Sequence, residues 1–571
     1  MIKTLRASHS RKKGCLFDDW WLANADLEDI IAEAWQSITP CSKKAFLWMF
    51  AIINIVFLWH TMTFFFGNHD WGQIKKGIEI GWSLFDGRFG AGLIQQLVGG
   101  DILPVMNNLF CFCGFCLAMI ALAKYWELPK TTLIYTIFGL FIMLLPYTYP
   151  CLQFVRSETH FWNILLIVWA LFLVEKAGIK PQLAAFTLFV FSYGCYPATI
   201  QSIIIILSGR CLLRVWFDNL SFQELIKKYY KPALSIFLSL IIYSLVFALK
   251  KKWEALTYAE AIEPVTISVL MQHLRDLPYA LWETFVDNSY YMPTWFKLFL
   301  SSSLLFMGYL MFQKSWQQNL LVILIMAVMI FSSQICNLLS VHDYTAQLRL
   351  GFFAVPYIYA LGWAILLRQE GNFWKNTALI LMMMAIYYAG LQAFRDQKVK
   401  YFDLQYEMKI MNNIRSRIKA SPNFEPGRKY RLLMIGRLYS EDDPTPFDRF
   451  HKKINHEDGW APFVPEWNAK DFFDFYEKDS FIKISFSEWR DVLPEREIKY
   501  MDIDYLLGKA RPWPHPDSVY VDRYFIYIIF NGEALQNMRE KIINMGYDNK
   551  DKLKEERNWD IKREAKPDIF I

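Results

Sequence analysis

No cysteine follows Cys336 in this 571-residue chain, and all nine cysteines lie between Cys15 and that position. The C-terminal region therefore cannot hold a disulfide framework or a paired-cysteine zinc site. Cys111, Cys113 and Cys116 are closely spaced, but no histidine or carboxylate accompanies them in their apolar run. We expect these three thiols to pack as small buried hydrophobes rather than to bind a metal.

A basic stripe, a nucleotide-binding loop and a cleaved signal are also lacking. The formal net charge is only +6, with lysines and arginines scattered among carboxylates, which argues against a nucleic-acid partner. No glycine-rich loop joins a strand to a helix, and no repeat or low-complexity tract is present. The first 43 residues mix basic with acidic side chains, so the first apolar segment should remain as an anchor.

Apolar residues, by contrast, are abundant. Hydrophobic side chains make up 54% of the chain and aromatic ones 17%, and the mean hydropathy is +0.16, which is too apolar for a soluble protein of this size. A spanning helix needs about 20 mostly apolar residues. The sequence predicts an all-α polytopic membrane protein with eleven spans, near residues 44–66, 103–123, 132–149, 160–175, 181–196, 198–216, 231–250, 293–313, 318–338, 349–368 and 374–394.

The distribution of lysine and arginine predicts the orientation of these spans. The N-terminal segment and the loops on the same side of the membrane hold more lysines and arginines than the loops on the other side. This distribution predicts a cytoplasmic N-terminus, and eleven spans then put the C-terminus outside. If residues 181–216 form one span plus a re-entrant piece, the C-terminus changes sides. The segment from Phe217 to Lys231 is predicted to be an interfacial amphipathic helix.

The composition becomes charged and soluble after Arg395. Helical spacing marks residues 403–420 and 533–547, and buried-strand patterns mark residues 430–436 and 524–530. We therefore expect three parts: a cytoplasmic segment (1–43), a transmembrane domain (44–395) and a small periplasmic α/β domain (396–571). Asp502-Ile503-Asp504 has the D-x-D form used by nucleotide-sugar enzymes, but this short pattern is common by chance.

The first outer loop begins with His69 and Asp70, directly beyond the first span. A carboxylate at the headgroup level can be partly desolvated, which raises its pKa and suits it to act as a base. Asp70 could equally be a solvated residue at the end of the helix or a structural partner of His69. Apolar residues then recur at helical spacing, which predicts a helix lying flat on the outer surface. Asp86 and Arg88 follow the end of this predicted helix. Arg88 either binds a phosphate group or anchors the segment at the membrane interface.

Charged and polar side chains recur in the later outer segments. A charge close to the hydrocarbon is energetically costly, so it normally has a charged partner or a function. They are Arg156, Glu158 and His160 before the fourth span, and His342, Asp343 and Arg349 before the tenth. Ordinary headgroup-level salt bridges would explain either group alone. Tyr193 and Tyr196 lie at the outer end of the fifth span, where they are either belt aromatics or a face for a sugar ring.

Four stretches carry a family resemblance: "GRFGAGLIQQL", "DILPVMNNL", "FVRSETHF" and "SYGCYPATIQSIIIIL". Together with the acid after the first span, they resemble the Gtr-type membrane glucosyltransferases, which add glucose to O-antigen in the bacterial inner membrane. The resemblance covers roughly residues 45–395. Proteins of that kind are similar in layout to GT-C glycosyltransferases, which take sugar from polyprenyl phosphate on the outer side of the membrane.

The resemblance implies an inverting transfer that needs neither metal nor cofactor. Asp70 would be the general base, with Glu158 as the alternative base or a sugar ligand. Arg88, and with it Arg156 or Arg349, would hold the departing polyprenyl phosphate. The remaining substrate-binding candidates are His69, Asp86, Tyr193, Tyr196, His342 and Asp343. Relatives often show two adjacent acids after the first span, whereas this chain has His69-Asp70, so a dual-carboxylate role does not carry over.

The expected partners are a polyprenyl-phosphate sugar, a surface glycan acceptor such as lipopolysaccharide O-antigen, membrane lipid, a donor-synthesising glycosyltransferase and a flippase. Two rivals stay open at this point. A transporter or flippase of a lipid-linked sugar would keep ionisable groups near the bilayer midplane, whereas most predicted spans have none there. Another envelope glycan polymerase or ligase would use the same outer loops and the same class of donor.

Overall fold

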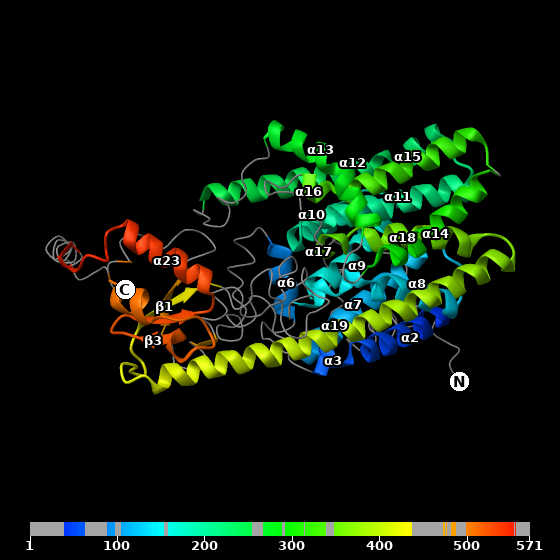
Figure 1. The fold of residues 1–571 in the computed structure, drawn as a ribbon. Coiled ribbons are helices and arrows are strands. Elements are labelled where there is room, and N and C mark those ends of the chain that lie inside the picture. The colour runs from blue at the N-terminus through cyan, green and yellow to red at the C-terminus, as the bar shows by residue number, and fades with distance from the viewer. Residues whose placement is uncertain are drawn as a thin grey trace, which may run out of the picture.

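The computed structural model describes residues 39–62, 88–97, 104–153, 158–176, 178–253, 266–287, 292–312, 314–338, 348–436, 472–473, 476, 481–486, 498, 500–552 and 554. Most of the described elements are helices, which gather into a bundle (Figure 1). A small sheet lies apart from this bundle, and the long helix α19 runs from one to the other (Figure 1).

Helices cover most of each of the eleven predicted apolar segments, and two further helices lie outside them. The helices are α2 (Pro40–Val56), α3 (Leu58–Met62), α6 (Phe89–Leu97), α7 (Pro104–Tyr125), α8 (Thr132–Leu144), α9 (Glu158–Val174), α10 (Ile179–Cys195), α11 (Thr199–Asp218), α12 (Phe222–Trp253), α13 (Ile267–Phe285), α14 (Thr294–Met311), α15 (Trp316–Ser332), α16 (Ile335–Leu338), α17 (Leu348–Gly351), α18 (Val355–Arg368) and α19 (Asn372–Ala420). Two short 3₁₀ turns, η1 (Pro146–Thr148) and η2 (Pro150–Gln153), follow α8.

Five helices in the described ranges are both long and apolar enough to cross a membrane. They include Val105–Tyr125, Thr199–Asp218, Phe222–Leu249, Thr294–Met311 and Asn372–Ala420. Helix α8 and the turns after it pass the same test together, although the pair bends by 55°. The chain is therefore a membrane protein built mainly of helices. The eleven-span count and the side of the C-terminus stay predictions.

The predicted interfacial helix is wrong, and the predicted domain boundary at residues 395–396, which stays a prediction, falls inside a helix. The proposed interfacial helix from Phe217 to Lys231 is not separate: α11 continues to Asp218, and the later residues are the first turns of the 32-residue α12. Likewise α19 is one helix of 49 residues, about 74 Å long at 1.5 Å per residue, and residue 396 lies inside it. Charged residues end a hydropathy run without ending a helix, because lysine, glutamate and glutamine are good helix formers.

The core of the bundle is apolar and closely packed. Helix α7 packs against α9, α9 against α10, and α11 against α15. Cys111 and Cys116 are fully buried in this core, as expected of small hydrophobes, whereas Cys113 is only partly buried. Gly114 lies against the ring of Trp162, so the run that holds the three thiols contacts α9 directly.

The C-terminal sheet has the strand order β2-β1-β4-β3. Its strands are β1 (Tyr430–Ile435), β2 (Phe481–Phe486), β3 (Val519–Val521) and β4 (Phe525–Ile529); β1 is parallel to β2 and β4, and β3 is antiparallel to β4. The strands predicted at 430–436 and 524–530 are confirmed, as is a helix at 533–547, seen as α23 (Gly532–Asn544). The shorter elements are a π-helical turn η4 (Tyr505–Lys509) and a 3₁₀ turn η5 (Pro516–Ser518).

Each face of this sheet has its own apolar cluster, because alternate strand residues point to opposite sides. Leu432 and Ile528 pack with the distal part of α19, around Ile414. Leu433 and Ile529 pack on the other side with α23. The sheet is thus covered on one face by the same helix that begins in the bundle.

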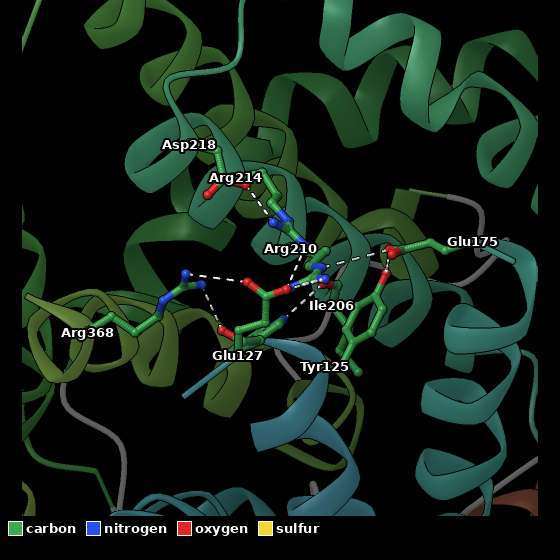
Figure 2. Close-up of polar contacts among 9 residues, drawn as sticks. Tyr125, Glu127, Glu175, Ile206, Arg210, Arg214, Asp218 and Arg368 are labelled. Carbon is green, nitrogen blue, oxygen red and sulfur yellow. Dashed lines mark hydrogen bonds and ion pairs between the residues drawn. The ribbon is translucent and has the colours of Figure 1, made fainter. Parts of the chain in front are cut away.

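A cluster of ion pairs joins the ends of several helices of the bundle (Figure 2). At its centre is Glu127, which has a left-handed φ of 55° and is the second residue after α7. Its carboxylate forms ion pairs with three arginines: the oxygens lie 2.8 Å from Nη2 of Arg210, 2.5 Å from Nη2 of Arg214 and 3.4 Å from Nη2 of Arg368. Arg368 also donates to the carbonyl of Trp126 at 3.0 Å. One carboxylate therefore ties together the ends of α7, α11 and α18.

Replacing Glu127 with Gln should lower the free energy of unfolding by roughly 1–3 kcal/mol. The change leaves three arginines without their shared charge partner, but about a third of the Glu127 side chain is exposed, so the loss stays below that of a fully buried pair. The thermal unfolding midpoint in detergent micelles measures the effect. Glu370→Gln is the control, because Glu370 is exposed near the same helix end. Equal midpoints for both variants would contradict a structural role for the cluster.

Candidate functional site

Arg88 lies immediately before α6, whose glycines let it press against α10. The amide of Gly92 donates to the carbonyl of Arg88 at 3.1 Å, which ties this residue to the first turn of the helix. A Cβ on Gly90 would lie 2.6 Å from the carbonyl oxygen of Phe191, and one on Gly194 would lie 2.4 Å from the ring of Phe89. Only glycine allows so close an approach at these two positions. The contact brings Arg88 to the end of α10.

Arg88 lies over one aromatic ring, and that ring packs against two others. Its guanidinium carbon is 5.2 Å from the ring centroid of Tyr196, which is the residue that follows α10. The Tyr196 ring stacks on Phe353 at 5.3 Å and meets the imidazole of His160 at 4.9 Å. His160 comes from the first turn of α9, and Phe353 lies between α17 and α18. We call Arg88, His160, Tyr196 and Phe353 the outer cluster.

The guanidinium of Arg88 makes no hydrogen bond and no ion pair with any residue that the structure describes, although its side chain is half-buried. The arginines at the other end of the bundle differ, because Arg210, Arg214 and Arg368 all pair with Glu127. A cation that lies over an aromatic face keeps its N–H groups available for an oxyanion. The outer cluster can therefore offer a planar fork of donors to a phosphate group.

Burial separates the two tyrosines that the sequence singles out. Tyr196 is only partly buried and lies beside Arg88. Tyr193 is fully buried, its hydroxyl lies 3.5 Å from the carbonyl of Ile236, and its ring packs near Tyr243. Of the pair, Tyr196 is the one placed to contact a bound molecule.

Several predicted site residues lie outside the described residues. These are His69, Asp70, Asp86, Arg156, His342 and Asp343. For Glu158 and Arg349 the structure describes only the backbone: Glu158 begins α9, and Arg349 belongs to α17. Glu158 is two residues from His160, and Arg349 is four residues from Phe353. Both predicted residues therefore belong to the chain segments that carry the outer cluster.

Phe353 is a member of the outer cluster that sequence reasoning missed. It is fully buried and contacts both Tyr196 and His160. The only signal in the sequence is an aromatic pair, Phe352-Phe353, just after the polar loop that precedes α17. An aromatic pair in a membrane protein normally indicates core packing, so this pattern alone does not point to a site.

The D-x-D pattern in the C-terminal domain has a structural role. Asp502 accepts the amide of Tyr505 at 2.9 Å and the hydroxyl of Tyr520 at 2.8 Å, while Asp504 pairs with Lys550 at 2.8 Å. Burial, together with the bond to Asp502, raises the pKa of Tyr520 to about 12, so this hydroxyl remains a donor at neutral pH. Among the described residues, no three histidines, cysteines or carboxylates are grouped as metal ligands.

Gly90→Ala should lower the free energy of unfolding by about 1–3 kcal/mol, because the added methyl group would overlap the backbone of α10. Gly308→Ala is the matched control, since nothing lies within 4 Å of the added atom, and it should be neutral or slightly stabilising. Thermal unfolding of the two purified variants provides the comparison. Equal midpoints would mean that α6 does not press against α10.

A family model described as glucosyl transferase GtrII matches residues 48–367, more than half of the chain. The match begins inside α2, ends at the last turn of α18, and includes all four residues of the outer cluster. Comparison with curated proteins and with solved structures found no match. The match to the family model confirms the resemblance seen in the sequence, and the chain belongs to the GtrII family of glucosyl transferases.

Proposed function

We propose that this protein transfers a glucosyl residue from a polyprenyl-phosphate donor to O-antigen or a related surface glycan, at the periplasmic face of the bacterial inner membrane. Membership of the family supports glucosyl transfer. The observation that carries the choice of donor is Arg88: a half-buried guanidinium that lies over Tyr196 and has no described acidic partner. A phosphate linked to a membrane lipid fits a cation placed at the ends of membrane helices.

In the proposed reaction, Asp70 takes the proton of the acceptor hydroxyl while the oxygen attacks the anomeric carbon. The new glycosidic bond forms as the bond between that carbon and the phosphate oxygen breaks, and the bonding electrons leave with polyprenyl phosphate. Attack from the face opposite the leaving group inverts the anomeric centre. Arg88 stabilises the negative charge that grows on the leaving phosphate. Glu158 is the alternative base, and no step needs a metal.

The sidedness of the site follows from charge. Arg88 and Tyr196 lie near the start of α11, whereas Arg210 and Arg214 lie near its end, about 17–23 Å further along the helix at 1.5 Å per residue. Basic residues accumulate at that second end, which the positive-inside rule assigns to the cytoplasm. This charge distribution supports a periplasmic position for the outer cluster, where nucleotide sugars are absent and a lipid-linked donor would be required.

A transporter of the same lipid-linked sugar is the competing function. In α14 the only charged residue is Lys297, which is buried in the first turn and donates to the carbonyl of Glu283 at 2.6 Å. This cation is therefore bonded near a helix end rather than presented at the bilayer midplane, where transporters hold their substrates. The placement favours an enzyme.

Purified protein in lipid nanodiscs tests the proposal directly. Radiolabelled glucose should appear on the acceptor glycan when it is supplied on polyprenyl phosphate, and not when it is supplied as a nucleotide sugar. Transfer from the nucleotide sugar alone would overturn the proposed donor. In sealed vesicles, movement of the labelled donor across the bilayer without acceptor and without transfer would favour the transporter.

A further inference from the structure

The turn that carries Tyr196 is held by hydrogen bonds between α10 and α11. The amide of Tyr196 donates to the carbonyl of Ser192, in the last turn of α10, at 3.2 Å. The carbonyl of Tyr196 accepts the amide of Thr199 at 3.1 Å and the hydroxyl of Thr199 at 2.7 Å. These bonds are local, so they shape the turn but do not fix it against the helices around it.

A buried asparagine of α9 joins this turn to a neighbouring helix. Nδ2 of Asn163 donates to the carbonyl of Ser192 at 3.0 Å, and the Asn163 side chain is fully buried. Asn163 follows His160 by three residues, so the two side chains share one face of α9. The same face therefore supplies the imidazole that meets the Tyr196 ring and the amide that holds the turn behind it.

The other ring of the stack is held by a bond of the same kind. The hydroxyl of Ser202, in the first turn of α11, donates to the carbonyl of Phe353 at 2.6 Å, and Ser202 is fully buried. The ring of Phe353 stacks on Tyr196. Each of the two rings is thus fixed through a backbone carbonyl by a buried polar side chain, and such buried bonds rigidify the groups they join.

The bond made by Asn163 should add little to the stability of the fold. Its Oδ1 is buried and has no hydrogen-bond partner among the described residues, and a buried acceptor left unpaired opposes folding. If Asn163 were lost, the carbonyl of Ser192 would keep the amide of Tyr196 as its donor. What the bond does supply is a fixed place for the turn, and with it for the Tyr196 ring.

We propose that Asn163 is a positioning residue that acts through Tyr196 on Arg88. This inference rests on the proposed function, in which Arg88 stabilises the leaving phosphate. The guanidinium of Arg88 lies 5.2 Å from the centroid of the Tyr196 ring and makes no hydrogen bond or ion pair with a described residue. The ring is therefore the contact that sets where the cation lies. Loss of Asn163 should misplace the cation without removing it.

The test compares Asn163→Ala with Asn319→Ala in the nanodisc transfer assay. Asn319 is a matched control on α15, which contributes no residue to the outer cluster. Its Nδ2 donates to the carbonyl of Met311 at 3.0 Å, that carbonyl also accepts the amide of Lys314, and its Oδ1 has no described partner either. Asn163→Ala should lower kcat by about 10- to 100-fold with little change in KM for the donor, because a small misplacement of a catalytic group has effects of that size. Asn319→Ala should leave kcat unchanged, and the thermal unfolding midpoints of the two variants should fall by similar amounts.

A double variant separates positioning from general stability. If Asn163 acts through the ring, adding Asn163→Ala to Tyr196→Leu should cause little further loss of kcat. Asn163→Ser, whose hydroxyl is one bond shorter than the amide, serves if Asn163→Ala does not accumulate in the membrane, and it should show the same loss. A full additional loss in the double variant, or equal kcat for the Asn163 and Asn319 variants, would overturn the inference while leaving the proposed function intact. Full activity of Arg88→Gln would instead overturn the role proposed for Arg88.

Discussion

Replacing Arg88 with Gln should lower the rate of glucosyl transfer by about 10²–10³-fold, the range found when one preorganised donor to a developing negative charge is removed. The structure offers the reason: this guanidinium is half-buried over Tyr196 and makes no hydrogen bond or ion pair with a described residue. Glutamine keeps a polar group of similar reach but carries no charge. Because charge on the phosphate grows as its bond breaks, the loss should appear mainly in kcat.

Two comparisons sharpen this test. Arg88→Lys keeps the charge but loses the planar fork, so it should retain part of the activity. Arg275→Gln removes an exposed cation of α13 that is not part of the outer cluster, and it should leave transfer unchanged. If Arg88→Gln behaved like Arg275→Gln, the assignment of Arg88 as phosphate holder would be wrong. Initial rates at saturating and at low donor concentration separate kcat from KM.

Asp70→Asn should reduce kcat by about 10²–10⁴-fold, the usual contribution of a general base. Asparagine has nearly the same shape as aspartate but cannot take the acceptor proton, so the protein should still reach the membrane and still bind the donor. Measuring donor binding beside transfer distinguishes a lost base from a lost binding site.

Glu158→Gln decides between the two candidate bases. The backbone of Glu158 begins α9, two residues before His160 of the outer cluster. If Asp70 is the base, Glu158→Gln should have the smaller effect on kcat and should act mainly on KM for the sugar. The reverse order of effects would transfer the role of base to Glu158.

The sequence predicted the helices well because their signal is local. Each predicted span contains a helix, and buried runs such as Tyr430–Ile435 became strands of a mixed sheet. Hydropathy failed where a helix outlasts its apolar stretch, as it does in α12 and α19. A change from apolar to charged side chains marks the edge of the membrane and does not mark the end of a helix.

Contacts between distant segments could not be predicted from one sequence. In the structure Arg210, Arg214 and Arg368 share Glu127, which comes from a different loop. Gln397 accepts the amide of His60, which lies 337 positions earlier in the chain. Arg88 could be proposed from sequence because its neighbours, an acid and glycines, lie close to it in the chain. The ring beneath its guanidinium, Tyr196, comes from a distant segment.

The most direct measurement is the mass of the surface glycan from otherwise identical cells that carry the wild-type protein, the Asp70→Asn variant or no protein. Glucosyl transfer predicts a glycan one hexose heavier per modified unit in wild-type cells, and loss of that hexose in the other two, with the variant still present in the membrane. Identical glycan masses in all three strains would contradict the proposed function.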